Sequence, residues 1–143
     1  MLFRSGLWVA TRKTIGLQGE QEAVRYLRKQ GYQIIAHRER ILRGDIDIIA
    51  LDKRTVVFIE VRSRTSTHHG HPAETIDARK KQQICTLANA YIKQNRLENY
   101  SFRLDVITVL FTPSLPIQNR WFFWRSGHSP IIEHFQNAFE MDS

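Results

Sequence analysis

Residues 44–64 read GDIDIIALDKRTVVFIEVRSR, two runs of apolar, largely β-branched residues joined by a short polar turn. This pattern predicts two strands that pair as a β-hairpin. Each run nevertheless carries acids, Asp45 and Asp47 in the first and Glu60 in the second. A carboxylate in an apolar strand is uncommon unless a cation neutralises it, so these acids are candidates for a functional role.

The alternation of side chains fixes the expected register of this hairpin. Folding the strands about the turn at residues 53–54 sets Asp47 opposite Glu60 and Asp45 opposite Arg62. A slip by one residue would turn acids toward the apolar face, which makes the slip costly. The apolar face would consist of Ile46, Ile48, Ala50, Val57, Ile59 and Val61.

The pair formed by Asp47 and Glu60 is the main candidate for chemistry. Directly opposed side chains have Cβ atoms about 4.5–5.5 Å apart, where like charges destabilise a sheet. Three arrangements would relieve the repulsion: protonation of one carboxyl, neutralisation by Arg62 and other cations, or a divalent cation between the acids. Mg²⁺ or Mn²⁺ would suit, because these ions prefer oxygen ligands and keep positions for water and phosphate.

Glu20 is a third acid in an apolar setting. Residues 16–30 predict a helix with Ala23, Val24 and Leu27 on one side, and Glu20 precedes them at helical spacing. It therefore shares their core-facing side and points toward the sheet. A bound metal ion would explain it, and so would an arginine or the positive end of the helix.

The whole chain predicts an α/β fold with a mixed central β-sheet flanked by helices, because its segments run in the order α, three β, α and further β. Residues 1–13 are expected to form a flexible basic N-terminal tail, and residues 14–143 a single domain. The expected helices are 16–30 and 78–95, and the expected strands are 32–40, 45–51, 55–64, 101–111, 120–125 and 130–139, the last with a terminal helical turn.

The amino-acid composition limits the kinds of partner and compartment that can be expected for this protein. The 143 residues include 21 Lys and Arg against 14 Asp and Glu, a net charge of +7, which favours a polyanion such as nucleic acid or an anionic membrane surface. The single cysteine, Cys85, excludes an internal disulfide and a thiolate zinc cluster, and it favours a reducing, cytoplasmic setting. No apolar run is long enough for a signal peptide or a membrane span, so no membrane association is expected.

The acids match a known pattern. Glu20 on a helix, Asp47 in a strand and the tripeptide 60–62, Glu-Val-Arg, resemble the signature of the PD-(D/E)XK nuclease superfamily, in which the archaeal Holliday-junction resolvases are close in architecture. More narrowly, the chain is similar to the YraN-like endonuclease family. Between residues 16 and 139 the matching stretches are GLQGEQEAVRYLRKQGYQII, RGDIDIIA, VVFIEVRSR, GHPAETID with Lys80, ANAYI, FRLDVITV and IEHFQNAF.

The resemblance implies a restriction-endonuclease-like fold and metal-dependent cleavage of nucleic acid, with DNA in repair or recombination as the substrate. It implies that Asp47 and Glu60 hold Mg²⁺ or Mn²⁺ with the carbonyl of Val61, and that Glu20 binds a second ion or an associated water. Arg62 stands where the superfamily has a catalytic lysine. Arginine stabilises developing charge but stays protonated, so it cannot act as a base; Lys80, on the second expected helix, could replace part of the lysine's role.

Basic residues around these acids are expected to hold the phosphate backbone without reading sequence. They are Arg38, Arg40, Arg43, Arg64, Arg79, Lys80 and Lys81. Two other functions remain open: a non-catalytic nucleic-acid-binding module that retains the nuclease fold, and a protein-interaction subunit whose acids are satisfied by internal arginines. Related resolvases act as dimers, which allows a homodimer here.

Three other motifs have mainly structural interpretations. The HHGH stretch at 68–71 is expected in a solvated loop, and RWFFWR at 120–125 in a buried edge strand, with stacking on unpaired bases as the alternative. Arg103 and Asp105 lie two residues apart in FRLDVITV and so share a face of the expected strand. They could form an ion pair near the candidate site, or Asp105 could have a structural role.

Overall fold

Five segments rich in β-branched residues form strands, and two segments with an apolar stripe form helices that cover the sheet. The structure is a computed structural model that describes residues 12–65, 76–111 and 130–141. In chain order the elements are α1 (Arg12–Lys29), β1 (Gln33–Ile41), β2 (Gly44–Asp52), β3 (Thr55–Arg64), α2 (Ala78–Gln94), β4 (Ser101–Leu110) and β5 (Ile131–Phe135).

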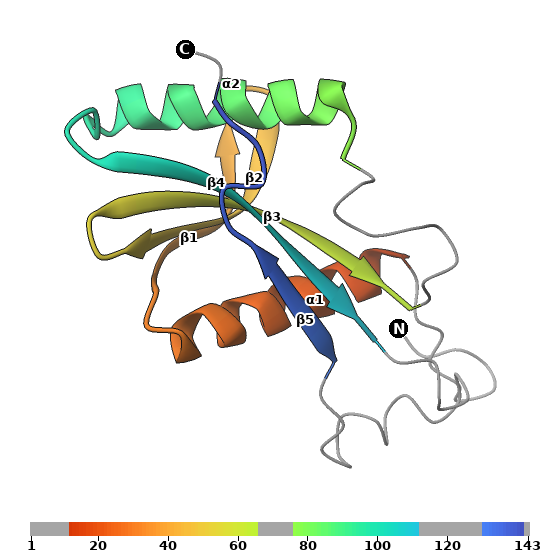
Figure 1. Ribbon diagram of the computed structural model, residues 1–143. Coiled ribbons are helices and arrows are strands. Elements are labelled where there is room, and N and C mark those ends of the chain that lie inside the picture. Colours follow the sequence, from red (N-terminus) through yellow and green to blue (C-terminus); the bar gives the residue numbers. More distant parts are fainter. Residues whose placement is uncertain (1–11, 66–75, 112–129, 142–143) are drawn as a thin grey trace.

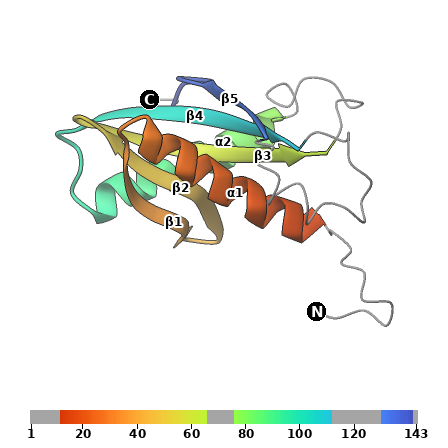
Figure 2. The same ribbon diagram turned by 90° about the horizontal axis from the view of Figure 1, so that it is seen from below.

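The sheet is mixed, as the sequence predicted. Its strand order is β1-β2-β3-β4-β5, with β3 and β4 parallel and every other neighbouring pair antiparallel. A parallel pair needs a crossover connection, and α2 lies within it. Figures 1 and 2 show α1 on one face of the sheet and α2 on the other, so the α/β class with flanking helices is confirmed.

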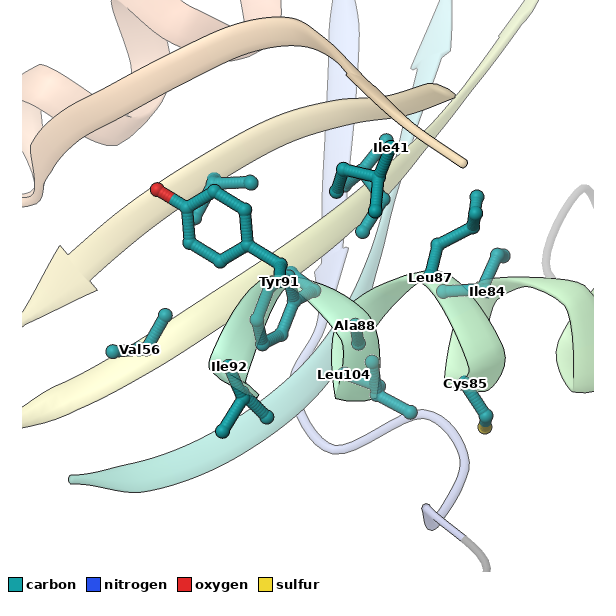
Figure 3. Packing of buried hydrophobic residues seen from close by; sticks show 12 residues of the cluster. Ile41, Val56, Ile84, Cys85, Leu87, Ala88, Tyr91, Ile92 and Leu104 are labelled. Carbon is teal, nitrogen blue, oxygen red and sulfur yellow. The ribbon is translucent and has the colours of Figure 1, made fainter. Parts of the chain in front are cut away.

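Each helix buries its stripe against one face of the sheet. On the α2 face, Phe58 of β3 packs edge-on against Tyr91, with ring centroids 5.8 Å apart. Figure 3 shows Tyr91 and Ile92 of α2 packed in this cluster beside Val56 of β3 and Leu104 of β4. On the α1 face, Leu27 is fully buried in a cluster with Ile59 of β3 and Ile107 of β4. The two apolar clusters hold the central strands rigidly, and rigid strands are the elements that position a site best.

Glycine sets the distance between α1 and the sheet. A Cβ atom added at Gly19 would collide with the Oγ of Ser63 on β3, so the helix backbone approaches the strand directly at this point. Glu20 follows at once in the chain and is 8% exposed. The absence of a side chain at Gly19 therefore lets α1 bring an acid down to the sheet.

Several segment boundaries differ from those expected. α1 begins at Arg12, four residues before the expected start at residue 16 and inside the stretch predicted to be a tail. Residues 136–141 contain a turn and no helix, so the predicted terminal helical turn is wrong. The chain turns there because Asn137 adopts φ 51° and donates its backbone N–H to Asp105.

Some expectations concern residues that the structure leaves undescribed. These are the rest of the predicted tail (1–11), the HHGH loop (68–71) and the aromatic strand (120–125). Neither of the two described helices combines the length and apolar character that crossing a membrane requires.

Candidate metal and phosphate site

The β2–β3 hairpin has the predicted register, but its ladder stops just before the acids. The paired residues run from Asp52 and Thr55 at the turn to Ile48 and Ile59, one position short of Asp47 and Glu60. Asp45 does not face Arg62 in this ladder; it pairs with Arg40 of β1, with Nη1 and Oδ1 3.6 Å apart. The prediction that Asp47 pairs with Glu60 and Asp45 with Arg62 in the β2–β3 ladder is therefore wrong.

The alternation of side chains is interrupted at Asp47. Ile46 belongs to the apolar cluster on the α2 face, whereas Ile48 belongs to the cluster on the α1 face. Residues two apart in a regular strand share a face, so the strand is irregular between them. The prediction that Ile46 shares one apolar face with Ile48 is therefore also wrong. This irregularity lets the Asp47 side chain turn toward the gap between β2 and β3.

The carboxyl groups of Asp47 and Glu60 are nevertheless close together, although these residues are not paired in the β2–β3 ladder. Asp47 accepts the backbone N–H of Val61 at 2.9 Å through Oδ2. A side-chain hydrogen bond between the two carboxyl groups favours the ionised form of Asp47 and the protonated form of Glu60. The expectation that a tight reversal of the chain brings Asp47 and Glu60 together is met.

Burial favours the protonated form of Glu60. Glu60 is 7% exposed, and its burial, together with the adjacent charge of Asp47, raises its pKa to about 7, even though Lys80 and Arg62 favour the ionised form. Burial also raises the pKa of Asp47, and the N–H of Val61 only partly offsets this. The pair therefore releases its proton near neutral pH, where a cation could take the proton's place.

Two cations flank Glu60 without capping it. The Nε atom of Arg62 and the Nζ atom of Lys80 lie 3.6 and 3.8 Å from Oε1 of Glu60, beyond ordinary hydrogen-bond distances. Within the part of the chain that the structure describes, the buried Nε of Arg62 has no hydrogen-bond partner. An unsatisfied buried donor is costly, and it marks the place where a ligand oxygen would be stabilised.

Helix geometry explains how Lys80 reaches this position. Asp77 caps the start of α2 by accepting the backbone N–H of Lys80 at 2.8 Å. Lys80 is therefore held in the first turn of α2, on the face of the sheet to which Glu60 and Arg62 project. Its contact with Glu60 supports the idea, drawn from the sequence, that it compensates for Arg62.

Glu20 approaches the pair from the α1 face but is already neutralised. Its carboxylate accepts hydrogen bonds from Arg38, with Nε at 2.6 Å and Nη2 at 3.2 Å, and lies 3.1 Å from Nε2 of His37. Consecutive strand residues usually point to opposite faces, but Arg38 has φ 55°, which allows both side chains to reach one acid. The arginine that the sequence left open as an explanation for Glu20 is Arg38.

This arrangement fits a hard divalent cation only in part. Among the described residues, no three His, Cys, Asp or Glu side chains form a ready metal centre. Asp47 and Glu60 offer two carboxylates that Mg²⁺ or Mn²⁺ could join in place of a proton, and the remaining positions would be filled by a backbone carbonyl, water or phosphate. Glu20 still acts on the pair, because its charge helps to raise the pKa of Asp47.

The other basic residues predicted to grip phosphate have different immediate surroundings. Arg40 contacts Asp45, and Nζ of Lys81 lies 6.0 Å from the ring centroid of Phe139. Arg43 and Arg79 line one cavity between the β1–β2 turn and α2. The backbone carbonyl of Arg64 accepts the N–H of Phe111.

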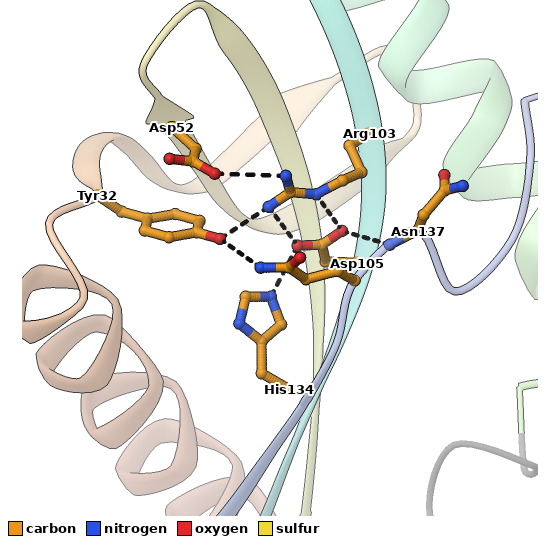
Figure 4. Close-up of polar contacts among 7 residues, drawn as sticks. Tyr32, Asp52, Arg103, Asp105, His134 and Asn137 are labelled. Carbon is orange, nitrogen blue, oxygen red and sulfur yellow. Dashed lines mark hydrogen bonds and ion pairs between the residues drawn. The ribbon is translucent and has the colours of Figure 1, made fainter.

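A second polar cluster lies on the α1 face, and its chemistry is structural (Figure 4). Arg103 and Asp105 form an ion pair with Nε and Oδ1 2.9 Å apart, and Asp105 is fully buried. Burial alone would raise the pKa of Asp105, but hydrogen bonds from His134, Arg103 and the backbone of Asn137 outweigh it and lower that pKa. The hydroxyl of Tyr32 accepts hydrogen bonds from Arg103 at 2.8 Å and from the Gln136 amide at 3.1 Å.

This cluster joins β5 and the following turn to the centre of the sheet. The sequence suggested the Arg103–Asp105 pair as one of two possibilities, but it carried no signal for Tyr32, His134 or Gln136. His37 beside Glu20 was missed for the same reason. Each of these contacts joins residues from separate elements, so only the folded chain reveals it.

Comparison with known proteins places the chain in a family. The family model described as "Uncharacterised protein family UPF0102" matches residues 19–109. A UPF0102 protein from Caldanaerobacter subterraneus subsp. tengcongensis is 41% identical over 102 residues, which cover 71% of this chain and 84% of the relative. Another, from Geobacter metallireducens, is 37% identical over 129 residues, which cover 90% of this chain and 94% of that relative.

Among solved structures, the crystal structure of a repair endonuclease from Pyrococcus abyssi is similar at a TM-score of 0.39 and 16% identity, covering 76% of this chain and 43% of that one. The family resemblance read from the sequence is confirmed by the family model and by relatives that align with nearly the whole chain. The chain therefore belongs to the uncharacterised protein family UPF0102.

Proposed function

We propose that the protein is a metal-dependent endonuclease that hydrolyses nucleic-acid phosphodiesters, with DNA in repair or recombination as its expected substrate. The observation that carries the proposal is the buried carboxyl pair of Asp47 and Glu60, whose pKa values are both raised, beside an unsatisfied N–H of Arg62. Such a pair costs stability, and a cost of this kind is typical of functional sites.

In this proposal Asp47 and Glu60 hold Mg²⁺ or Mn²⁺, with the carbonyl of Val61 as the further ligand that the superfamily implies. The ion would polarise the phosphate and make the attacking water more acidic. The protein's own contribution begins when Glu60 gives up its proton, which its pKa of about 7 allows near neutral pH.

The cations of the site would act on the phosphate. The free Nε–H of Arg62 is available to a non-bridging oxygen, and Lys80 adds a second positive charge on the same side of Glu60. Both stabilise the negative charge that develops during cleavage. Glu20 would orient water next to the pair, while Arg38 and His37 hold its carboxylate in place.

The test is cleavage of DNA by the purified full chain in Mn²⁺. Asp47→Asn and Glu60→Gln should each abolish cleavage of branched, flapped, single-stranded and duplex substrates. Binding of the same substrates in EDTA should stay within about threefold, because neither substitution removes a cation. Glu98→Gln removes an exposed carboxylate far from the pair and should leave both activities unchanged. Cleavage that persists in both site variants would exclude the pair from the chemistry.

The alternative is a non-catalytic nucleic-acid-binding module, and one observation favours it. Glu20 is fully paired with Arg38 and His37, and arginine stands at position 62, so the site lacks both a free third acid and the usual lysine. Wild-type protein that binds DNA but leaves every substrate intact in Mn²⁺ would support this function. Binding that is absent or insensitive to salt would instead favour a protein-interaction role.

A further inference from the structure

A cavity of about 740 Å³ lies between the β1–β2 turn and the outward side of α2. A volume of this size is typical of sites for small organic ligands. Gly44 keeps the turn close to the helix, since an added Cβ would come 2.8 Å from Leu87 and 3.1 Å from Gln83. The cavity is lined by Leu42, Arg43, Gly44, Arg79, Gln82, Gln83, Thr86 and Leu87.

Four of the five polar side chains that line this cavity are unused within the described structure, and the fifth, Thr86, donates its hydroxyl to the backbone carbonyl of Gln82 at 3.0 Å. Arg43, Arg79 and the side-chain amides of Gln82 and Gln83 make no hydrogen bond or ion pair with any described residue. No acid lines the cavity among the described residues, so the two arginines give this part of its lining a net positive charge. Leu42 adds an apolar group to the lining and is 61% exposed.

These groups match the parts of a nucleotide. Arginines bind phosphate and stack on bases, the glutamine amides can donate to and accept from a base edge, and leucine packs against a base face. A protein segment would need a partner for both arginines and would gain little from two amides. The charge and the mixed lining therefore favour a nucleotide over a peptide.

The cavity adjoins the proposed catalytic pair. Arg79 directly precedes Lys80, whose Nζ contacts Glu60, and Gly44 lies three residues before Asp47 on the same strand. Three residues of strand span about 10 Å. A strand whose phosphate lies at Asp47 and Glu60 could therefore place a neighbouring nucleotide in the cavity.

We propose that this cavity holds an unpaired nucleotide next to the cleaved phosphate, so that the substrate carries a single-stranded segment. The inference rests on the proposed function and names its substrate class. A base can enter such a cavity only when it is neither stacked nor paired, because its face and edge are otherwise covered. An intact duplex would meet only the rim of the cavity.

The test compares binding of a fluorescein-labelled single-stranded oligonucleotide with binding of a blunt duplex of the same length, both in EDTA. Thr86→Trp blocks the cavity from an exposed helix position without changing charge. It should weaken single-strand binding about tenfold, as expected when one stacked base is lost, and change duplex binding less than about threefold. Gln94→Trp, near the far end of α2, is the matched control and should leave both affinities unchanged.

A separate experiment tests whether the two arginines of the cavity bind phosphate. Arg43→Ala combined with Arg79→Ala should reduce the slope of log affinity against log salt for the single strand by about 1.4, which corresponds to two phosphate contacts. Arg54→Ala combined with Lys93→Ala removes the same charge elsewhere and should leave that slope unchanged. Thermal unfolding checks that each variant is folded.

Each outcome bears on the inference. Equal losses for single strand and duplex in Thr86→Trp, or no loss at all, would overturn it, and so would equal slope changes in the two charge-reduced proteins. Cleavage in Mn²⁺ without a cavity-dependent single-strand preference would refute the substrate class and keep the nuclease. A cavity-dependent preference without cleavage would keep the nucleotide site and refute the nuclease.

Discussion

Replacing Glu60 with Gln should stabilise the protein at alkaline pH, although it removes the central acid of the site. Glu60 is 7% exposed, and the nearest cations lie 3.6 and 3.8 Å away, so ionisation leaves a poorly compensated buried charge next to Asp47. Glutamine has nearly the same shape, cannot ionise, and can still donate a hydrogen bond to Asp47. The substitution therefore removes the repulsion and keeps the contact.

The magnitude follows from the pKa of Glu60, which rises from 4.5 to about 7 on folding. Because the folded pKa is raised, the stability contributed by the proton on Glu60 is fully present below pH 4.5 and is lost as the pH rises through 7. A shift of about 2.5 units at 1.36 kcal/mol each corresponds to about 3 kcal/mol, counted once for the coupled pair. For a domain of this size that is about 10 °C in Tm.

The assay is thermal and urea unfolding of wild type and Glu60→Gln between pH 4.5 and 9 in EDTA. The two proteins should be similarly stable at pH 4.5, and the variant should exceed wild type by about 3 kcal/mol at pH 9. Glu98→Gln controls for the change in net charge and should show no pH-dependent difference from wild type. Parallel stability curves for wild type and Glu60→Gln would falsify the account of a strained carboxyl pair.

Three further predictions, made with five substitutions, test other parts of the structure. Gly19→Ala should lower the free energy of unfolding in urea by about 1–3 kcal/mol, because the added Cβ atom would collide with Ser63. Gly16→Ala is the control and should raise it by about 0.5–1 kcal/mol, because no atom lies near the added Cβ. A gain in stability at both positions would contradict the close approach of α1 to β3. Asp105→Asn should cost about 3–5 kcal/mol in the same assay, since it removes the fully buried charge partner of Arg103 and leaves only the more exposed Asp52, whose Oδ2 lies 3.4 Å from Nη1 of Arg103. A loss below 1 kcal/mol would show that the cluster is dispensable. In single-turnover cleavage, Arg62→Ala should lower the rate by about 10²-fold or more while Arg62→Lys keeps most of it, and an unchanged rate in the alanine variant would remove Arg62 from the mechanism.

Much of the fold could be predicted because its signals are local. The β-branched runs placed β2 and β3, and alternation fixed their register from the turn as far as Ile48 and Ile59. The stripe on residues 84–92 identified the buried side of α2, which the structure confirms at Ile84, Leu87, Ala88, Tyr91 and Ile92. Periodicity is a property of neighbouring residues, so one sequence suffices to read it.

The candidate site could be predicted only in outline. Acids in apolar strands identified Asp47 and Glu60, but periodicity assumes a regular strand and therefore could not show that β2 becomes irregular between Ile46 and Ile48. Glu20 was placed correctly at the sheet, yet its partner depended on the left-handed φ of Arg38, which no residue type at that position signals.

The sequence by itself determined the strand and helix pattern, the excess of positive charge and the identity of the acids that lie among apolar residues. Only the tertiary structure decided that Asp47 and Glu60 are buried side by side with raised pKa values, that Lys80 reaches Glu60 from α2, and that Asp105 is bound by Arg103 and His134. The physical reason is that hydrophobic periodicity acts between near neighbours in the chain. Charge compensation depends on distances of a few ångströms between elements, and those distances exist only after the helices pack on the sheet.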